Sequence, residues 1–587
     1  MLDDILLEVN KPAQYIGQEW NVTKKDFQQS YIKFALCFPD LYEIGMSNLG
    51  IRIIYSILNS LPDVSCERFF ACNSDMEQIL RKRKIEIFSL ESKRPLREFD
   101  IIGFSLGSEL DYTNILNILE LGSVPLQSAL RDCSFPLVIG GGPCTLNPEP
   151  MHEFFDLFII GEAEELLLEF IDIYRKYKEK YKIGKITKQD LLFIFSQIPG
   201  VYAPSLYEVK YTPSGQIEEF KAKIEGIADK IKKRIVKDLD TSSFPLDWLV
   251  PYIQIVHDRI TLEIMRGCPN RCRFCQARAQ YFPARFKGIK NILNLACQTY
   301  KRTGYEEISL AGLSVTDYSQ IEELLQSLVG LFKPKTVSVS LPSIKAKLMV
   351  GGLSSLIATV KKTGLTFAPE AGSERLRKIL AKDFNEQEFF QTLEEAYISG
   401  YQHVKLYFMI GLPHEKQTDL DDIINLTNRV SELKRKINKI PAQVNISINT
   451  FIPKPHTPLQ WLGMEDMEGI KYKQNYLKDK VKKYLTCSGR QERLRLNFHN
   501  RYMSFLEGVF SRGDRRLSQV IYLAFKNGAK FDAWANHFAF DKWLDAFKES
   551  NIEPGFYLKE KSPDEFLAWD FIDVGIGKEA LITEFNR

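Results

Sequence analysis

The first 175 residues alternate between apolar runs that stop at glycine or proline and segments whose apolar residues recur at helical spacing. Continuous apolar runs of this kind predict buried parallel strands with ligand-binding loops at their carboxyl ends. The predicted strands are Ile32–Phe38, Asp100–Leu106, Leu137–Ile139 and Phe155–Ile160. Met46–Leu58 has the helical pattern, with Ser47 or Asn48 as the expected N-cap. Residues 31–175 are therefore predicted to form an open parallel sheet, preceded by an arm of residues 1–30.

The same alternation returns between residues 251 and 460. Six apolar strands are predicted there: Thr261–Met265, Glu307–Leu310, Thr336–Leu341, Leu365–Glu370, His403–Met409 and Val444–Phe451. Helical patterns lie between them, for example at Tyr318–Leu331 and Asp419–Lys434. Repeated strand–helix units favour a parallel barrel, whose chemistry belongs at the carboxyl ends of the strands.

The two remaining segments have different patterns. Residues 176–250 are predicted to form a connector with a β-hairpin, because Ser205–Val209 and Ile217–Ala222 flank a turn at Thr212–Gly215. Residues 461–587 are predicted to be mostly helical. The expected fold class is α/β: a flavodoxin-like, Rossmann-like parallel sheet, then a partial TIM-type barrel of six β/α units, then a mostly helical C-terminal region.

Composition narrows the functional classes. The 587-residue chain is 44% hydrophobic and 26% charged, with a net charge of +3, so no overall field demands a nucleic acid partner. It contains no run of eighteen apolar residues, and its first residues lack the pattern of a signal peptide. We therefore expect a cytoplasmic protein with no membrane partner. Its ten cysteines are expected to be reduced or metal-bound.

The main chemical signal is a cluster of three cysteines, Cys268, Cys272 and Cys275, directly after the first predicted barrel strand. Thiolates are soft ligands that suit zinc or iron–sulfur clusters. Structural zinc normally takes four ligands, and the next cysteine, Cys297, lies in an apolar helical pattern. Three thiolates on a four-iron cluster would leave one iron open to an outside ligand, which is a catalytic arrangement. A zinc knob is the alternative.

The CxxxCxxC spacing, with Phe274 before the last cysteine, resembles the signature of the radical S-adenosylmethionine (radical SAM) enzymes. The resemblance implies a 4Fe-4S cluster held by the three cysteines, with the open iron chelating the methionine part of SAM. It also implies that the backbone of Phe274 contacts the adenine of SAM.

Further SAM contacts are expected at the other strand ends. Glu370 is expected to bind the ribose hydroxyls, although a helix-dipole or salt-bridge role is the alternative, and Ser373 is expected to cap the following helix. Arg375 would pair with the SAM carboxylate, or else with Glu374 or Glu370. The resemblance places Gly411 and Pro413, in a GLP motif, beside adenine. Where many radical SAM proteins have GGE, this chain has Ala311-Gly312-Leu313, so Gly312 keeps part of the site that holds the SAM amino group.

The N-terminal sheet resembles the cobalamin-binding domain that precedes many radical SAM barrels. The matching positions are Ser105, Leu106, Gly140, Gly141 and Gly142 in the loops around the corrin, and Gly161 and Glu162 after the last strand. Many cobalamin domains have DxHxxG, but this chain has Tyr42 in the position of the histidine and Gly45 at the end of the motif. A phenol is a poor cobalt ligand at neutral pH. Cobalamin is therefore expected to bind without a histidine beneath the metal; a flavodoxin-like domain that binds no corrin is the alternative.

The resemblance extends through most of the chain, including the motifs FPDLYEIGMSNLG, FAPEAGSERLR, YFMIGLP, PKPHTP and RGDRR. It implies reductive cleavage of SAM to a 5′-deoxyadenosyl radical, with an electron donor such as flavodoxin or ferredoxin. Methylation of an unactivated carbon is the favoured reaction. The alternatives are another radical reaction, such as a rearrangement, or a corrinoid- or redox-responsive binding protein.

The substrate is not specified by these motifs. Between Lys471 and Arg516, basic residues outnumber acidic ones by thirteen to four, with tyrosine and phenylalanine interleaved. This pattern is typical of a solvated helical face, or of a patch for an anionic substrate such as RNA. Arg512–Arg516 reads as a capped turn or a phosphate-facing loop.

Overall fold

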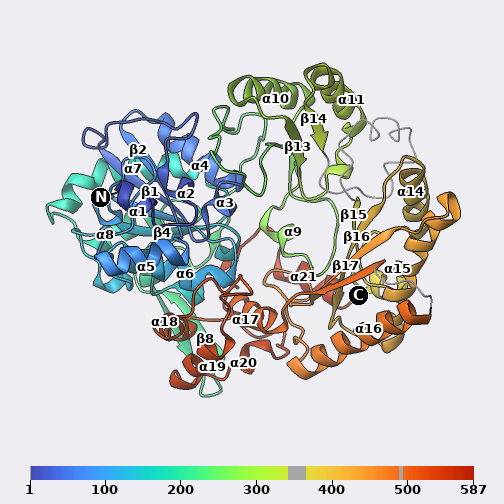
Figure 1. Cartoon of the computed structure of the whole chain (residues 1–587). Coiled ribbons are helices and arrows are strands. Elements are labelled where there is room, and N and C mark those ends of the chain that lie inside the picture. Colours follow the sequence, from blue (N-terminus) through green and yellow to red (C-terminus); the bar gives the residue numbers. More distant parts are fainter. Residues whose placement is uncertain (1, 341–364, 488–492) are drawn as a thin grey trace.

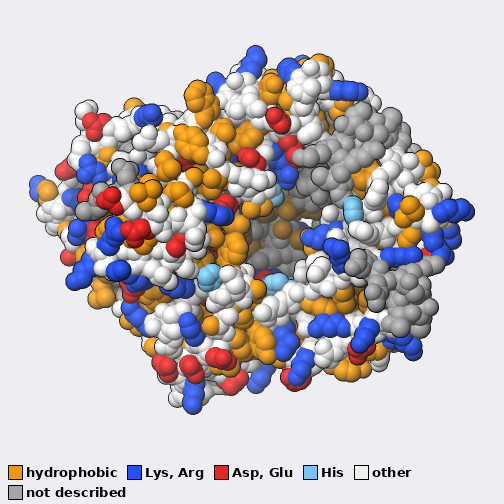
Figure 2. Space-filling model, in the orientation of Figure 1, with side chains coloured by type: hydrophobic (Ala, Val, Ile, Leu, Met, Phe, Trp, Pro, Cys, Tyr) orange, Lys and Arg blue, Asp and Glu red, His pale blue; other side chains and the backbone are white. Residues whose placement is uncertain are grey.

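The computed structural model describes residues 2–340, 365–487 and 493–587. The N-terminal domain lies beside the barrel, and C-terminal helices run beneath both (Figure 1). Figure 2 shows that the face of the molecule is hollowed between the N-terminal domain on the left and the barrel on the right. Among the described residues, no helix is both long enough and apolar enough to cross a bilayer. The predicted fold class is confirmed.

The N-terminal sheet has six strands in the order β2-β1-β3-β4-β5-β6, and only β6 is antiparallel to its neighbour. The strands are β1 (Ile32–Phe38), β2 (Val64–Phe70), β3 (Ile101–Ser105), β4 (Leu137–Gly141), β5 (Leu157–Ile159) and β6 (Val201–Tyr202). The connecting helices are α4 (Leu49–Ser60), α5 (Ser74–Arg83), α6 (Tyr112–Leu121), α7 (Leu166–Lys182) and α8 (Lys188–Ser196). Asn48 caps α4 by accepting a hydrogen bond from the backbone of Ile51. Strand order 2-1-3-4-5 is flavodoxin-like, and its switch point lies between β1 and β3.

Strand β2 was not predicted, because Glu67 and Arg68 interrupt its apolar pattern. Arg68 is nevertheless fully buried, where Glu19 (2.7 Å) and Glu91 (2.6 Å) neutralise it. Glu19 belongs to the N-terminal arm, which contains α1 (Leu2–Leu6) and α2 (Ala13–Ile16). The arm is therefore part of the domain's packing.

The barrel consists of parallel strands in two described sheets, β10-β13-β14 and β15-β16-β17-β18. The strands are β10 (Ile260–Glu263), β13 (Glu307–Ala311), β14 (Ser338–Ser340), β15 (Leu365–Glu370), β16 (His403–Ile410), β17 (Gln443–Thr450) and β18 (Leu494–Phe498). Its helices are α10 (Ile289–Thr303), α11 (Ile321–Phe332), α13 (Glu374–Ile379), α14 (Glu386–Ile398) and α15 (Gln417–Asn438). All six predicted strands have counterparts here. The predicted end of the third strand at Leu341 lies outside the described residues.

Strand β18 is a seventh barrel strand, paired in parallel with β17. Sequence analysis placed this segment in a mostly helical tail. Its alternation of buried and exposed residues spans only five positions, so the pattern was too short to stand out among the surrounding helices. The parallel sheet therefore continues past residue 460.

The connector contains the predicted hairpin, formed by β7 (Tyr207–Tyr211) and β8 (Ile217–Ala222). Its short strand β9 (Ile231–Lys232) pairs with β19 (Ile572–Asp573) near the C-terminus. The C-terminal helices are α16 (Met467–Cys487), α17 (Arg501–Ser511), α18 (Leu517–Lys526), α19 (Phe540–Glu549), α20 (Gly555–Leu558) and α21 (Lys578–Phe585). Apolar residues of α17, α18 and α19 join the core of the N-terminal sheet, whereas the barrel has a separate core.

The arginines of the RGDRR motif hold these parts together. Arg512 is buried and donates to backbone carbonyls of Pro453 (3.0 Å) and Tyr557 (2.8 Å). Arg515 pairs with Glu149 of the N-terminal domain (2.6 Å), and Arg516 pairs with Asp514 within the motif (2.6 Å). The guanidinium groups of the motif thus make internal contacts.

Candidate functional site

The cysteine loop, residues 267–284, connects two short strands that pair in antiparallel fashion, β11 (Met265–Arg266) and β12 (Arg285–Phe286). It leaves β11 through Gly267, where φ is +86° and a Cβ would lie 2.6 Å from the carbonyl oxygen of Tyr281. Only glycine fits such a turn without strain. The loop then enters helix α9 (Gln276–Gln280) directly after Cys275.

The three cysteines lie half-buried on this loop as free thiols. Burial raises the pKa of Cys272 to about 11, the charge of Lys382 lowers it, and the nearby Cys275 and Cys268 raise it. The sulfur groups are therefore close enough to repel one another as thiolates, so holding all three ionised requires a cationic group between them. This donor set fits a soft metal centre.

No three His, Cys, Asp or Glu side chains converge on a single-ion site in the part of the chain that the structure describes. An iron–sulfur cluster distributes its thiolates over several iron atoms, so its ligands stand farther apart than those of one zinc ion. Three thiolates on one loop fit a 4Fe-4S cluster that keeps one iron open to an outside ligand.

Asn270, which sequence analysis missed, connects this loop to the end of β13. Its side-chain amide donates to the sulfur of Cys268 (3.2 Å) and to the carboxylate of Asp317 (2.8 Å). The hydroxyl of Ser314 also donates to Asp317, at 2.6 Å. The segment that replaces GGE therefore supports the cluster loop through side chains. The polar residues Ser314, Thr316 and Asp317, which follow β13, were the feature of the sequence that could have indicated this contact.

Glu370 lies at the end of β15 after a β-bulge and adopts φ +69°, a left-handed conformation that is costly for glutamate. Burial raises its pKa, and Lys382, 3.3 Å away, opposes that shift. Its charge also raises the pKa values of Cys272 and Cys275. The structure therefore brings Glu370 beside the cysteines and adds Lys382, which sequence analysis did not identify.

Ser373 and Arg375 turn instead toward the start of α15. Ser373 caps α13, as expected, and donates to Asp419. Arg375 pairs with Asp419 and donates to the carbonyl of His414 (2.9 Å). Neither Glu374 nor Glu370, the two protein partners considered for Arg375 in sequence analysis, is the one observed, because Glu374 pairs with Lys378 and Glu370 with Lys382. The contact of Arg375 with the SAM carboxylate stays a prediction.

Phe274 and the GLP motif meet at the carboxyl ends of the barrel strands. Phe274 packs against a small apolar cluster that includes Ala371, Leu412 and Phe451, which follow β15, β16 and β17. Gly411 has φ +78°, and its backbone donates to Glu415 (2.9 Å). Pro413 follows, half-buried. The cluster loop is thus docked onto the strand ends, as expected for a barrel active site.

A cavity of about 660 Å³ lies between the N-terminal sheet and the barrel. It includes residues of β1 and β3, so it lies at the switch point of the sheet. Five residues predicted to bind cobalamin line it: Ser105, Gly141, Gly142, Gly161 and Glu162. The opposite wall comes from the barrel and includes Met265, Gly267, Gln280, Tyr281 and Gly312. The cavity therefore borders the cysteine loop, and Gly312 lies on it.

Four other residues predicted for cobalamin are outside the lining of this cavity. Tyr42 is buried and donates its hydroxyl to Glu19 (2.8 Å). A Cβ on Gly45 would lie 2.2 Å from the ring of Phe70, so this glycine permits close packing. Leu106 is 2% exposed, and Gly140 faces the side chain of Leu106 within the core. These residues shape the domain beneath the cavity.

A buried ionic network joins the cavity to the base of the cysteine loop. Arg266 pairs with Glu162 (3.2 Å) and Glu164 (2.7 Å), and Arg285 pairs with Glu162 (2.6 Å). Burial alone would raise the pKa of Glu162, but Arg285 and Arg266 outweigh burial and lower it. Because Arg266 and Arg285 are the paired residues of β11 and β12, the network fixes one domain against the other.

A second ionic cluster lies where the N-terminal domain, the barrel and α17 meet. Lys454, which follows β17, bonds to Glu109 (2.8 Å) and Glu507 (2.9 Å). Burial alone would lower the pKa of Lys454, but the two carboxylates outweigh it and raise the pKa. Sequence analysis gave no signal for this cluster, since its members are far apart in the chain.

Two family models match the chain. The model described as "Radical SAM proteins, N-terminal" matches residues 50–204, and the one described as "Radical SAM superfamily" matches residues 262–427. The chain is also 28% identical over 529 residues to an uncharacterized protein of Methanocaldococcus jannaschii, covering 88% of this chain and 97% of that protein.

Among solved structures, the radical SAM methyltransferase TsrM from Kitasatospora setae, with cobalamin and a [4Fe-4S] cluster bound, is 10% identical with a TM-score of 0.46, covering 71% of this chain and 72% of that chain. The cobalamin-dependent S-adenosylmethionine radical enzyme OxsB, with aqua-cobalamin and S-adenosylmethionine bound, is 12% identical with a TM-score of 0.45. The match covers 94% of this chain and 78% of that chain. The two family models fall on the N-terminal sheet and on the barrel that carries the cysteine loop. The chain belongs to the radical SAM superfamily.

Proposed function

We propose that this protein is a cobalamin-dependent radical SAM enzyme that methylates an unactivated carbon. The observation that carries the proposal is the cavity at the switch point of the N-terminal sheet, which opens onto the flanks of the cysteine loop. The structures of TsrM and OxsB contain cobalamin, but their similarity to this chain is too low to decide the reaction.

The chain's residues divide between two sites. Cys268, Cys272 and Cys275 would hold the cluster, and Glu370 with Lys382 would orient the sugar of SAM beside it. When bound, the cluster supplies the electron that cleaves SAM, and cobalamin supplies the methyl group. Gly141 leaves the end of β4 without a side chain on the cavity side, so a planar ring can approach the backbone there.

The cavity lining also bears on how cobalamin would be held. Neither histidine nor cysteine contributes to the lining found among the described residues. A corrin seated there would therefore have no imidazole or thiolate ligand from this lining. Tyr42, which replaces the DxHxxG histidine, also lies outside this lining, and its hydroxyl donates to Glu19.

The test is anaerobic reconstitution of the full chain with iron, sulfide and cobalamin, followed by reduction and incubation with SAM. We expect a retained corrin absorption band and the formation of 5′-deoxyadenosine and S-adenosylhomocysteine. The Cys275→Ala variant should keep the corrin band and lose both products. Products without a retained corrin would reject the cobalamin part of the proposal, and a retained corrin without either product would reject the enzymatic part.

A further inference from the structure

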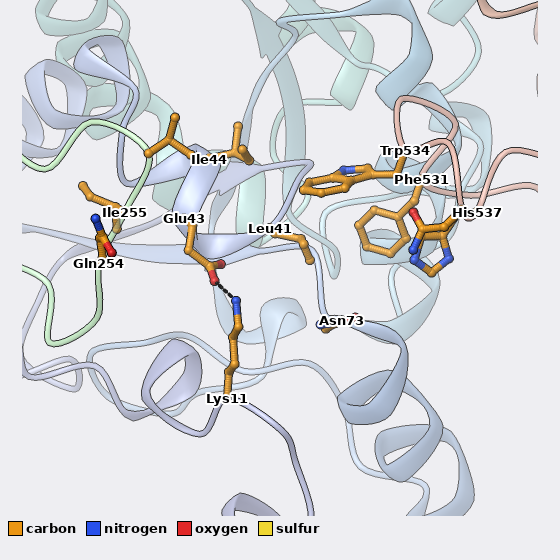
Figure 3. Close-up of a pocket in the computed structure, with 12 residues that line it drawn as sticks. Lys11, Leu41, Glu43, Ile44, Asn73, Gln254, Ile255, Phe531, Trp534 and His537 are labelled. Atoms are coloured by element: carbon orange, nitrogen blue, oxygen red, sulfur yellow. Dashed lines mark hydrogen bonds and ion pairs between the residues drawn. The ribbon is translucent and has the colours of Figure 1, made fainter. Parts of the chain in front are cut away.

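A second hollow, of about 510 Å³, is formed by five segments that are far apart in the chain (Figure 3). It shares no lining residue with the cavity at the switch point. Its walls come from the N-terminal arm, the segments that follow β1 and β2, the segment that leads into the barrel, and the loop between α18 and α19. The lining residues are Lys11, Leu41, Glu43, Ile44, Asn73, Gln254, Ile255, Val256, Phe531, Trp534, Asn536 and His537.

One wall of the hollow is aromatic. Figure 3 shows the rings of Trp534, Phe531 and His537 together on one side, facing Leu41 and Asn73. The indole N–H of Trp534 donates to the carboxylate of Asp40 (2.9 Å), which fixes its orientation. The imidazole of His537 lies 5.5 Å from the ring of Phe531. The rings are therefore positioned before any ligand arrives.

Phe531 is held in an unfavourable backbone conformation, with φ +54°. Its N–H donates to the side chain of Asn114 (2.7 Å), which belongs to α6 of the N-terminal domain. Strain of this kind persists only where surrounding contacts enforce it, and it concentrates at binding sites. The bond to Asn114 places the aromatic loop against the N-terminal domain.

The polar groups of the hollow are uncharged or paired. Lys11 and Glu43 form an ion pair (2.8 Å), and Glu43 also accepts from Gln14 (2.6 Å). The side chains of Gln254 and Asn536 have no hydrogen-bond partner within the described ranges. The hollow thus offers amides that both donate and accept, but no unpaired cation for a phosphate.

We propose that this hollow binds a nucleobase. Flat aromatic side chains stack on unpaired bases, and amide side chains can form paired hydrogen bonds with base edges. Recognition would act through the base, because the one lysine in the lining is neutralised by Glu43. The base could belong to a free nucleoside or to a single-stranded RNA, and both present the same ring and edge. This site is independent of the cofactors of the proposed function.

The test is calorimetric titration of the full chain with adenosine, guanosine, cytidine and uridine, and with a short unstructured RNA. We expect at least one nucleoside to bind, with an affinity that is unchanged between low and high salt, since no phosphate contact is involved. Equal affinities for nucleoside and RNA would assign the site to free nucleosides. Tighter binding of RNA than of every nucleoside, again unchanged by salt, would assign it to single-stranded RNA.

The matched variants are His537→Ala, on an exposed side chain, and Trp534→Leu, with Trp20→Leu as the control on an exposed tryptophan outside the hollow. Loss of one stacking partner should weaken binding about 5- to 150-fold, and the control should not. His537→Ala keeps the test decisive if Trp534→Leu fails to fold. Absence of nucleoside binding, equal affinity in all variants, or binding of N-acetyltryptophanamide in preference to every nucleoside would overturn the proposal.

Discussion

Two neighbouring glycines at the end of β4 allow a sharp test of where the corrin would bind. Successive residues of a strand face opposite sides of a sheet. A Cβ built on Gly140 would lie 2.9 Å from the side chain of Leu106 and 3.0 Å from the ring of Phe155. A Cβ on Gly141 would meet only Ile159, at 3.8 Å, on the side of the cavity. The same substitution at the two positions therefore probes the core and the cavity separately.

The expected magnitudes follow from these distances. Forcing extra carbons into a well-packed region costs about 1–3 kcal/mol. In Gly140→Val the extra carbons crowd the core of the folded protein, so the free energy of unfolding should decrease by about that amount. In Gly141→Val the protein atoms leave room for the new side chain, and the cost appears only when a rigid ring occupies the cavity. Cobalamin affinity should then fall about 5- to 150-fold.

The assay measures retained cobalamin by absorbance after gel filtration, alongside denaturant unfolding of the cobalamin-free protein. Gly141→Val should lose cobalamin with little change in unfolding free energy, and Gly140→Val should do the reverse. If Gly141→Val retained cobalamin as well as the unsubstituted protein, the ring would not approach the end of β4. If both variants lost cobalamin in proportion to their loss of stability, the cavity assignment would have no support.

Three further predictions concern other parts of the structure. Burial lowers the pKa of Lys233 to about 8 in the folded protein, so the unfolded chain binds this proton more tightly. The free energy of unfolding should therefore increase by about 3 kcal/mol as pH rises from about 8 to 10.5. Denaturant unfolding should show this increase, and a similar increase in Lys233→Met would contradict the assignment to Lys233. Asn270→Ala removes an N–H donor to the sulfur of Cys268. Loss of this hydrogen bond should lower the reduction potential of the reconstituted cluster, measured by EPR titration. An unchanged potential would show that Asn270 does not donate to a cluster ligand. Arg512→Met leaves the carbonyls of Pro453, Gln460, Tyr557 and Lys559 without this donor. Because each buried carbonyl left unsatisfied costs about 1–3 kcal/mol, the protein should lose about 3–5 kcal/mol in denaturant unfolding, whereas a loss below about 1 kcal/mol would show that water replaces the guanidinium.

The sequence determined the features that depend on neighbouring residues. The cysteine loop, its glycine entry at Gly267 and the strands on which it lies are encoded locally, because spacing and backbone freedom act over a few positions. The strands β1, β3, β4 and β5 were recognisable for the same reason, since their side chains are uniformly apolar.

The remaining features depended on contacts between distant positions. Strand β2 contains Arg68, and nothing near it in the chain shows that Glu19 and Glu91 neutralise that charge. Likewise, the partner of Arg375 is Asp419. Arg375 lies in α13, which follows β15, whereas Asp419 lies in α15, which follows β16. Charge pairing of this kind is decided by which elements pack together, so the sequence leaves several partners equally plausible.

The glycines at the end of β4 show most clearly what sequence and tertiary structure each decide. By itself the sequence determined that Gly140–Gly142 end a strand and free the backbone for a ligand. Only the tertiary structure decided that Gly141 and Gly142 line the cavity while Gly140 faces the core, because the pairing of β4 with β3 and β5 sets which face of the sheet each residue points toward. It also placed the cysteine loop on the opposite wall, since that contact joins residues more than a hundred positions apart.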